Sequence, residues 1–157
     1  MGKRVQGTLD KLAKEIISSM IEEISKPRPQ ERNPRGRVAS GNLVKSFVPD
    51  ISEGKLGIYN TAGYDTVVDK GRRPGKFAPI APLVQWASIK GIVPRNNRSL
   101  RQFAFAVSYK LMKKGYPGID YVAKSFMNKQ DIITKELGDA YLLDAEEQLE
   151  KQNPNLK

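Results

Sequence analysis

Apolar residues near the N-terminus recur three and four positions apart, the spacing that places them on one face of an α-helix. The pattern stops just before Pro27, where a helix is expected to end. We therefore predict a helix over residues 8–25. Its buried face comprises Leu9, Leu12, Ala13, Ile16, Ile17, Met20, Ile21 and Ile24.

Between this helix and the middle of the chain, proline and basic residues replace the apolar pattern. Residues 26–38 include three prolines and are strongly basic, which predicts a mobile loop. Ser40 is a candidate cap for one helical turn. Strand patterns follow at residues 47–52, 55–60 and 64–69, separated by turns at Glu53-Gly54 and Ala62-Gly63. These three segments suggest a small antiparallel meander.

The second half of the chain returns to helical patterns after another basic loop at residues 70–82. A helix is expected from Pro82 to about Lys90, with Gly91 as its C-cap. Ser99 should cap a further helix that ends at residues 113–115. After a turn at residues 116–118, Asp120 is a candidate cap for a last helix that reaches about residue 150.

These elements predict an α+β fold in one domain spanning residues 1–157. A small antiparallel sheet of three or four strands is packed by the N-terminal helix and by two or three C-terminal helices. The aromatic residues at helical spacings are expected to pack in the core. They are Trp86, Phe103, Phe105 and Phe126.

Composition excludes several classes of chemistry. The chain has neither cysteine nor histidine, so thiol nucleophiles, thiolate zinc sites and imidazole bases are absent. It has no apolar run long enough to cross a membrane and no pattern of a secretory signal. We expect no catalytic set, no cofactor and no metal.

Charge is distributed unevenly along the chain. The formal net charge is +10, yet residues 131–150 carry −6 and residues 1–130 carry +14. Such asymmetry favours either attraction to phosphate or complementary patches between neighbouring copies of one protein. Composition alone does not choose between these two interpretations.

Two segments approach known chemical motifs without matching them. Residues 71–77 resemble a phosphate-binding loop, but they are one residue short between the glycines, and Phe77 replaces the hydroxyl that binds magnesium. Asp50 followed by Asp69-Lys70 is reminiscent of a metal-dependent nuclease. On a strand, however, Asp69 and Lys70 would point to opposite faces. We expect neither activity.

The basic loops are the candidate binding segments. They could neutralise phosphates, giving strongly salt-dependent binding to DNA, or they could face partner proteins. We assign them to contacts between subunits and with neighbouring proteins. The residues concerned are Arg28, Arg32, Arg35, Arg37, Lys70, Arg72, Arg73, Lys76 and Phe77.

Four short strings, in order, resemble the neck or tail-completion proteins of tailed bacteriophages, which join head to tail. They are SGNLVKS at residues 40–46, YDTVVDKGRRP at 64–74, LVQWA at 83–87 with Lys90-Gly91, and FAFAVSYKLMKKG at 103–115. The chain departs from the family by lacking the usual glutamate-phenylalanine pair before Gly71.

The resemblance implies a non-enzymatic virion protein, made in the host cytoplasm, that forms a ring, expected to be a hexamer, at the head-tail junction. Its partners would be further copies of itself, the portal-side connector or head-closure protein, and the tail-tube or tail-terminator protein. Genomic DNA would pass nearby without sequence-specific recognition, and no membrane would be involved. The acidic last helix could then dock on the basic surface of the adjacent copy. The alternatives are a basic DNA-associating module and a minor tail or tail-terminator protein.

Overall fold

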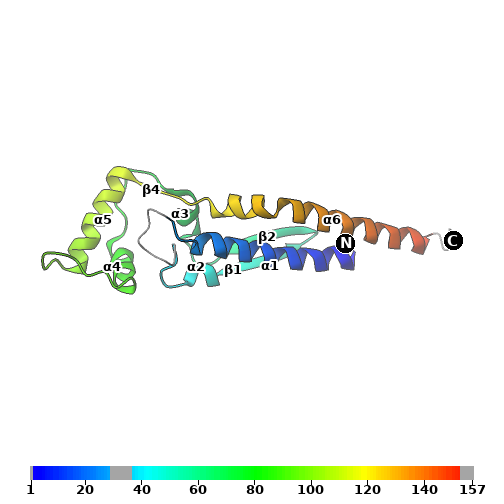
Figure 1. The fold of residues 1–157 in the computed structure, drawn as a ribbon, viewed down its shortest axis with the longest axis horizontal. Coiled ribbons are helices and arrows are strands. Elements are labelled where there is room, and N and C mark those ends of the chain that lie inside the picture. The colour runs from blue at the N-terminus through cyan, green and yellow to red at the C-terminus, as the bar shows by residue number, and fades with distance from the viewer. Residues whose placement is uncertain (1, 29–36, 153–157) are drawn as a thin grey trace. The chain divides into compact units, whose positions relative to one another are not determined.

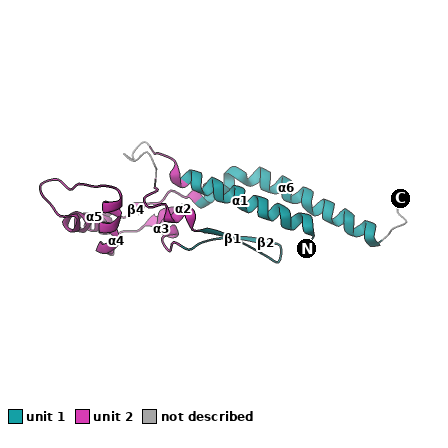
Figure 2. Ribbon diagram, turned by 90° about the horizontal axis from the view of Figure 1, so that it is seen from below, with its two compact units in different colours: residues 1–23, 47–61, 122–157 teal, residues 24–46, 62–121 magenta. Residues whose placement is uncertain are grey.

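The computed structural model describes residues 2–28 and 37–152 and confirms an α+β fold. The chain forms two compact units, shown in Figure 2. Unit 1 comprises Met1–Glu23, Phe47–Thr61 and Val122–Lys157, and unit 2 comprises Ile24–Ser46 and Ala62–Tyr121. Within the described residues the strands form two antiparallel sheets of two strands each.

Unit 1 is built from two long helices and a β-hairpin (Figure 1). Helix α1 (Lys3–Ser25) runs antiparallel to α6 (Tyr121–Gln152), and strands β1 (Phe47–Ser52) and β2 (Lys55–Asn60) lie alongside. The core includes the buried Val5, Leu9 and Ala140, against which partly buried residues of the hairpin and α6 pack. These are Ile51, Leu56 and Leu137.

Helix α1 buries the face that its apolar spacing predicted, but it starts five residues earlier than expected. Leu9, Leu12, Ala13 and Ile16 are all almost fully buried. The earlier start depends on Asp144 of α6, whose carboxylate accepts hydrogen bonds from the backbone N–H groups of Arg4 and Val5, at 3.4 and 3.0 Å. These donors have no partner within a helix, so a carboxylate there stabilises the first turn.

The hairpin follows its predicted boundaries at both strands. Its register pairs Phe47 with Asn60 and Ser52 with Lys55, leaving a two-residue turn at Glu53 and Gly54. Both turn residues have positive φ, 50° and 77°, as a type I′ turn requires. The short turn therefore sets the register of the whole hairpin.

Unit 2 contains the shorter helices and the second sheet. Its elements are α2 (Asn42–Lys45), α3 (Asp65–Lys70), β3 (Gly71–Arg72), α4 (Ile80–Ile89), α5 (Leu100–Lys114) and β4 (Tyr116–Pro117). Helices α4 and α5 pack against each other, and Ala87 and Ala104 are fully buried. A helical turn after Ser40 is confirmed, although the residue at its N-cap is Gly41.

Helix α5 matches its prediction at both ends. The Ser99 hydroxyl accepts from the Gln102 backbone N–H, and the Gln102 side chain accepts in return from the Ser99 N–H, which forms a complete capping box. The helix ends at Lys114, and Gly115 follows with φ 67°. Local sequence signals are therefore sufficient to define this element.

The predicted strand at residues 64–69 is wrong, because this segment forms α3. Its β-branched residues favoured a strand, yet Asp65 in the first turn and Lys70 in the last both suit the dipole of a helix. The backbone carbonyl of Asp69 is also bound by the N–H groups of Ile119 and Asp120, at 3.0 and 2.9 Å. Contacts distant in sequence outweigh the local β propensity.

The predicted loop at residues 70–82 also needs correction, because it contains β3 and the start of α4. Strand β3 pairs antiparallel with β4, which occupies two residues of the turn expected at 116–118. Helix α4 begins at Ile80, two residues before Pro82, and ends at Ile89 with Lys90 as its C-cap. Residues 26–28 and 37–38 lie in neither helix nor strand, and 29–36 lie outside the described residues.

Candidate assembly surfaces

Two residues of the first predicted basic segment, residues 26–38, make contacts with other residues of unit 2. The Arg37 guanidinium lies 4.3 Å from the centre of the Tyr116 ring, and the Arg37 backbone N–H donates to Ile24. Arg28 Nη1 donates to the Lys26 carbonyl at 3.3 Å. Arg32 and Arg35 lie outside the described residues. Arg37 thus holds the chain just after this segment through its contacts with Tyr116 and Ile24.

Lys70 lies between two carboxylates. Its Nζ is 3.2 Å from Oδ2 of the buried Asp69 and 3.1 Å from Oδ1 of Asp120. The hydrogen bond to Asp120, then the one to Asp69, raises the pKa of Lys70. The reason given above for rejecting a nuclease site was wrong, because Asp69 and Lys70 end a helix and contact each other. This lysine connects α3 to the start of α6.

Next to this ion cluster two backbone segments approach each other closely. This approach explains why glycine is required at three positions. A Cβ on Gly71 would collide with the Tyr116 carbonyl, one on Gly118 with the Asp69 carbonyl, and one on Gly115 with the Arg72 carbonyl. The chain on either side of β3 therefore crosses the chain around β4 at a spacing that side chains would prevent. This crossing connects the second sheet to α5.

Arg72 closes the loop that resembled a phosphate site. Its Nη2 donates to the carbonyls of Lys76 and Phe77, at 3.1 and 2.9 Å. Arg73, Lys76 and Phe77 are exposed around this closed loop. Of the residues predicted in the second basic loop, Lys70 and Arg72 make ion pairs or hydrogen bonds within unit 2. Lys70, Arg73, Lys76 and Phe77 are all exposed.

Aromatic residues expected in the core lie largely on the surface. Trp86, Phe105 and Phe126 are 37, 56 and 42% exposed, so the prediction of a core cluster is wrong for these three. The Phe77 ring lies 5.7 Å from that of Phe105 and 6.4 Å from that of Tyr109. Exposed aromatic side chains gathered in this way are typical of interaction surfaces.

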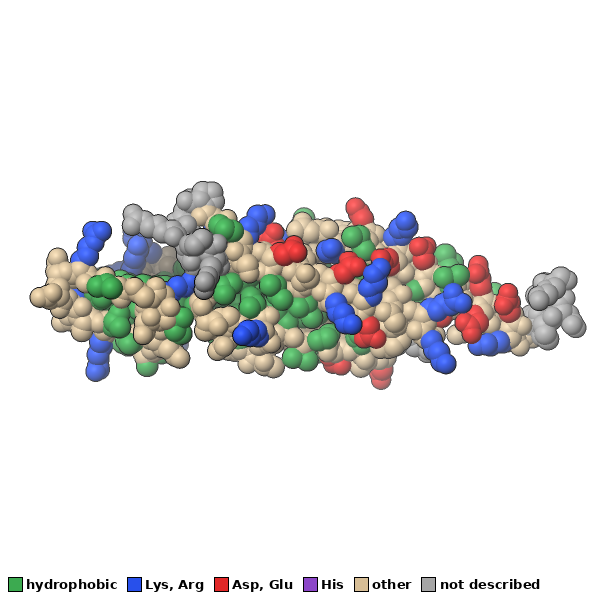
Figure 3. Space-filling view, turned by 60° about the horizontal axis from the view of Figure 1, so that its bottom comes forward, with side chains coloured by type: hydrophobic (Ala, Val, Ile, Leu, Met, Phe, Trp, Pro, Cys, Tyr) green, Lys and Arg blue, Asp and Glu red, His purple; other side chains and the backbone are tan. Residues whose placement is uncertain are grey.

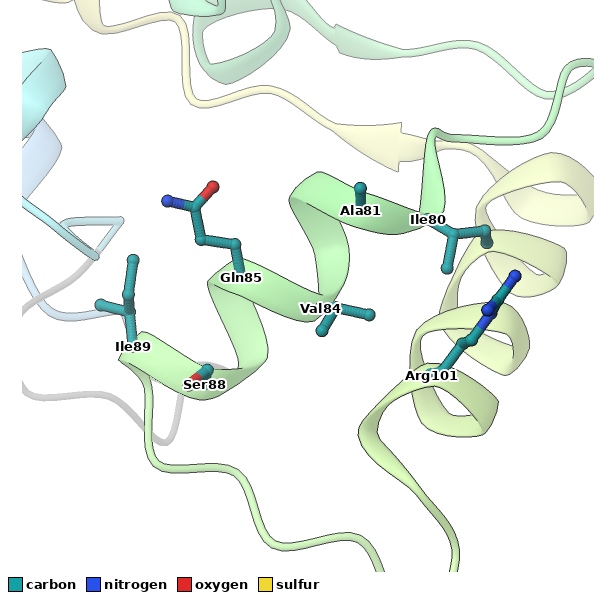
Figure 4. A pocket seen from close by; sticks show the side chains of 7 residues that line it. All are labelled: Ile80, Ala81, Val84, Gln85, Ser88, Ile89 and Arg101. Carbon is teal, nitrogen blue, oxygen red and sulfur yellow. The ribbon is translucent and has the colours of Figure 1, made fainter.

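A shallow groove of about 800 Å³ lies along α4 beside the start of α5 (Figure 4). Ile80 and Val84 point toward α5, and Arg101 reaches from α5 toward them. The complete lining is Ile80, Ala81, Val84, Gln85, Ser88, Ile89 and Arg101. The groove is mostly apolar, with a single cationic side chain.

The segment of the chain that forms this groove carries basic but no acidic residues. Residues 70–119 contain eleven lysines and arginines and not one aspartate or glutamate. In Figure 3, Lys and Arg but no acidic side chains are visible over the left end of the view, where α4 and α5 lie. Counted over the sequence, unit 2 carries a formal charge of +13 and unit 1 carries −3. The charge asymmetry therefore follows the two units.

Helix α6 presents a second apolar stripe besides the one it buries. Ala140 and Asp144 are buried, whereas Leu142 and Leu149 are 66 and 59% exposed. Residues 138, 142, 145 and 149 follow a 4,3,4 spacing and are all exposed, which defines an outer stripe of Gly138, Leu142, Ala145 and Leu149. Residues 139–150 carry five acids and no basic residue.

Ion pairs along unit 1 fix which face of α6 turns inward. Lys11 Nζ lies 2.6 Å from Glu136, Lys129 lies 3.6 Å from Glu15, and Arg4 lies 3.8 Å from Glu147. Hydrogen bonding to Glu136 raises the pKa of Lys11. These pairs line the interface of α1 with α6, so the outer stripe faces away from α1.

No family model, curated protein or solved structure matches this chain. Within residues 2–28 and 37–152, no group of three or more acidic side chains is placed to hold a metal ion. No helix in that part of the chain is long and apolar enough to cross a membrane.

The sequence patterns of single elements did not predict these exposed surfaces. The outer stripe had a signal, since its 4,3,4 spacing can be read directly from the sequence. The prediction for the last helix did not single it out, although α6 is apolar on two faces. The groove had no such signal, since its lining comes from two helices whose packing is tertiary.

Proposed function

We propose that the chain is a structural, non-enzymatic subunit of a tailed-bacteriophage virion that forms a ring at the head-tail junction, through which DNA passes. Its partners are further copies of itself, a portal-side connector or head-closure protein, and a tail-tube or tail-terminator protein. The four strings that resemble neck and tail-completion proteins support this proposal, as do the surfaces described above.

The observation that carries the proposal is that one chain presents two unlike surfaces. The α6 surface is apolar and acidic, whereas the α4–α5 surface is apolar and basic. Unlike surfaces on a single chain favour head-to-tail contacts between copies, and such contacts close into a ring when their rotation closes. A ring subunit requires this kind of asymmetry.

Disruption of the gene in the phage that encodes it provides the test. We expect the disrupted phage to accumulate filled heads and separate tails by negative-stain electron microscopy, and the intact gene supplied in trans to restore joined particles. Antibody labelling should place the protein at the neck. Joined, infectious particles that lack the protein would contradict the proposal, and labelling at the distal tail would favour a minor tail protein.

The acid-free segment from residue 70 to residue 119 favours a second candidate, a DNA-associating module. This candidate predicts duplex binding that falls steeply with salt and weakens when Arg73 and Lys76 are replaced by alanine. The matched control replaces Lys3 and Lys14, exposed lysines of α1, by alanine. Equal binding by both double variants, or no binding at low salt, would eliminate DNA association as the function.

A further inference from the structure

We propose that the outer stripe of α6 in one copy binds in the α4–α5 groove of a second copy, and that this contact joins successive subunits. The inference rests on the proposed function only in requiring that copies assemble. It specifies which surfaces meet, and it predicts a head-to-tail contact in place of a symmetric one.

The dimensions of the two surfaces suit each other. The outer stripe extends about 16 Å along α6, from Gly138 to Leu149, at 1.5 Å per residue. In the groove, Ile80, Val84 and Ser88 lie at successive turns of α4 and span about 12 Å, which accommodates most of the stripe's length. An apolar helix face lying in an apolar groove is a common mode of protein recognition.

The small residues of the stripe allow close packing. Gly138 and Ala145 alternate with Leu142 and Leu149, so the two leucines project between two shallow positions. A Cβ placed on Gly138 would meet no atom within 4 Å, which shows open space at this position of the stripe. A second helix can therefore approach α6 closely along this line.

Charge favours contact of the stripe with the groove of the second copy over contact with that copy's own stripe. Two stripes brought together would place the exposed Asp139, Glu146 and Glu150 of each copy close to those of the other. Two grooves brought together would place the acid-free 70–119 segments face to face. Only the unlike pairing brings acids, including the exposed Asp139, Glu146 and Glu150, close to Arg101 and its basic neighbours.

Disulfide trapping tests this contact directly, because the natural chain contains no cysteine. Full-length Leu142→Cys and Val84→Cys chains are prepared separately, mixed and oxidised mildly. We expect a disulfide-linked dimer that contains one chain of each kind. Asn128→Cys, exposed on the same helix but off the outer stripe, serves as the matched partner for Val84→Cys and should give little dimer.

Light scattering after gel filtration provides the second measurement. Leu142→Glu should raise the dissociation constant for self-association at least about tenfold, because a charge replaces an apolar contact at the centre of the interface. Asn128→Glu should leave it unchanged. Leu142 is largely exposed, so both variants should keep the helical circular dichroism of the natural chain.

The outcomes separate this inference from the proposed function. Assembly that survives Leu142→Glu, with no dimer between positions 142 and 84, overturns the inference and leaves the ring proposal standing. A Leu142→Cys/Val84→Cys double variant that crosslinks only within one monomeric chain shows that the groove is filled by the chain's own helix, which also overturns it. Trapped dimers from a protein absent from virions would support the contact and reject the phage function.

Discussion

At the scale of single residues, Asp144 has the clearest structural role. Its buried carboxylate binds the first backbone N–H groups of α1, which lies at the other end of the sequence. Gly2 precedes α1 without a side chain to cap it, and a Cβ at Gly2 would collide with the Asp144 carboxylate. One residue of α6 thus takes the place of a local N-cap.

Replacing Asp144 by alanine should lower the free energy of unfolding by about 1–2 kcal/mol, since the first turn of α1 loses its acceptor. Urea unfolding followed by circular dichroism measures the loss. Asp139→Ala removes the same charge from an exposed position of α6 and should change stability by less than about 0.5 kcal/mol. Equal losses in the two variants would show that the N–H contacts of Asp144 contribute nothing.

Tyr121 provides a pH-dependent prediction at the same scale. Burial, with added repulsion from Asp65 and Asp69, raises the pKa of this tyrosine to about 12 from 10.0. Because the folded protein holds the phenol proton more tightly than the unfolded chain, the resulting stability is full below pH 10 and is lost as the pH rises through 12.

Alkaline difference absorbance should therefore show a last tyrosine ionisation step near pH 12. Tyr121→Phe should remove that last step. The variant should also lose less stability than the natural chain between pH 10 and 12, in parallel thermal melts. A last step that persists in Tyr121→Phe would assign the raised pKa to another tyrosine.

At the scale of elements, α5 depends on local signals and α3 does not. The capping box of α5 is formed by residues three positions apart, so it is present as soon as the helix forms. Helix α3 has β-branched residues in its middle and makes its decisive backbone contacts with residues 119 and 120. The same propensity rules consequently describe one helix well and the other poorly.

Ser99→Ala should destabilise unit 2 by about 1 kcal/mol, because the N–H of Gln102 loses its acceptor at the helix start. The matched control is Ser18→Ala, an exposed serine inside α1, where alanine should be neutral or slightly stabilising. Urea unfolding curves compare the two variants. A Ser99→Ala curve that superimposes on the natural one would mean that the cap has no energetic role.

At the scale of the whole molecule, charge is separated between the units, with +13 on unit 2 and −3 on unit 1. Such separation promotes attraction between unlike units of different copies and repulsion between like ones. The apolar stripe and groove then supply an attraction that salt does not screen. Assembly should therefore respond to salt only in part.

Raising the salt concentration from about 0.1 M to about 1 M shortens the screening length from about 10 Å to about 3 Å. We expect a weaker association constant but persistent oligomers, measured by sedimentation velocity at several protein concentrations. Leu142→Glu should abolish the oligomers that persist at high salt. Association that strengthens steadily with salt would indicate a contact governed by apolar burial alone.

The sequence by itself determined the elements whose information is local. The α1 face, the hairpin with its Glu53-Gly54 turn and the capped α5 were all predicted, because spacing, turn and cap signals act between residues close in the chain. Of the nine predicted contact residues, Arg73, Lys76 and Phe77 are exposed, and their contacts with partners stay a prediction.

Only the tertiary structure decided the rest. Helix α3 in place of a strand, the early start of α1, the contacts of Arg37 with Tyr116 and of Lys70 with Asp120, and the outer stripe of α6 all depend on partners far away in the sequence. A helix with two apolar faces does not reveal which one will be buried. That choice is made by Asp144 and the ion pairs with α1, which form only once the chain has folded.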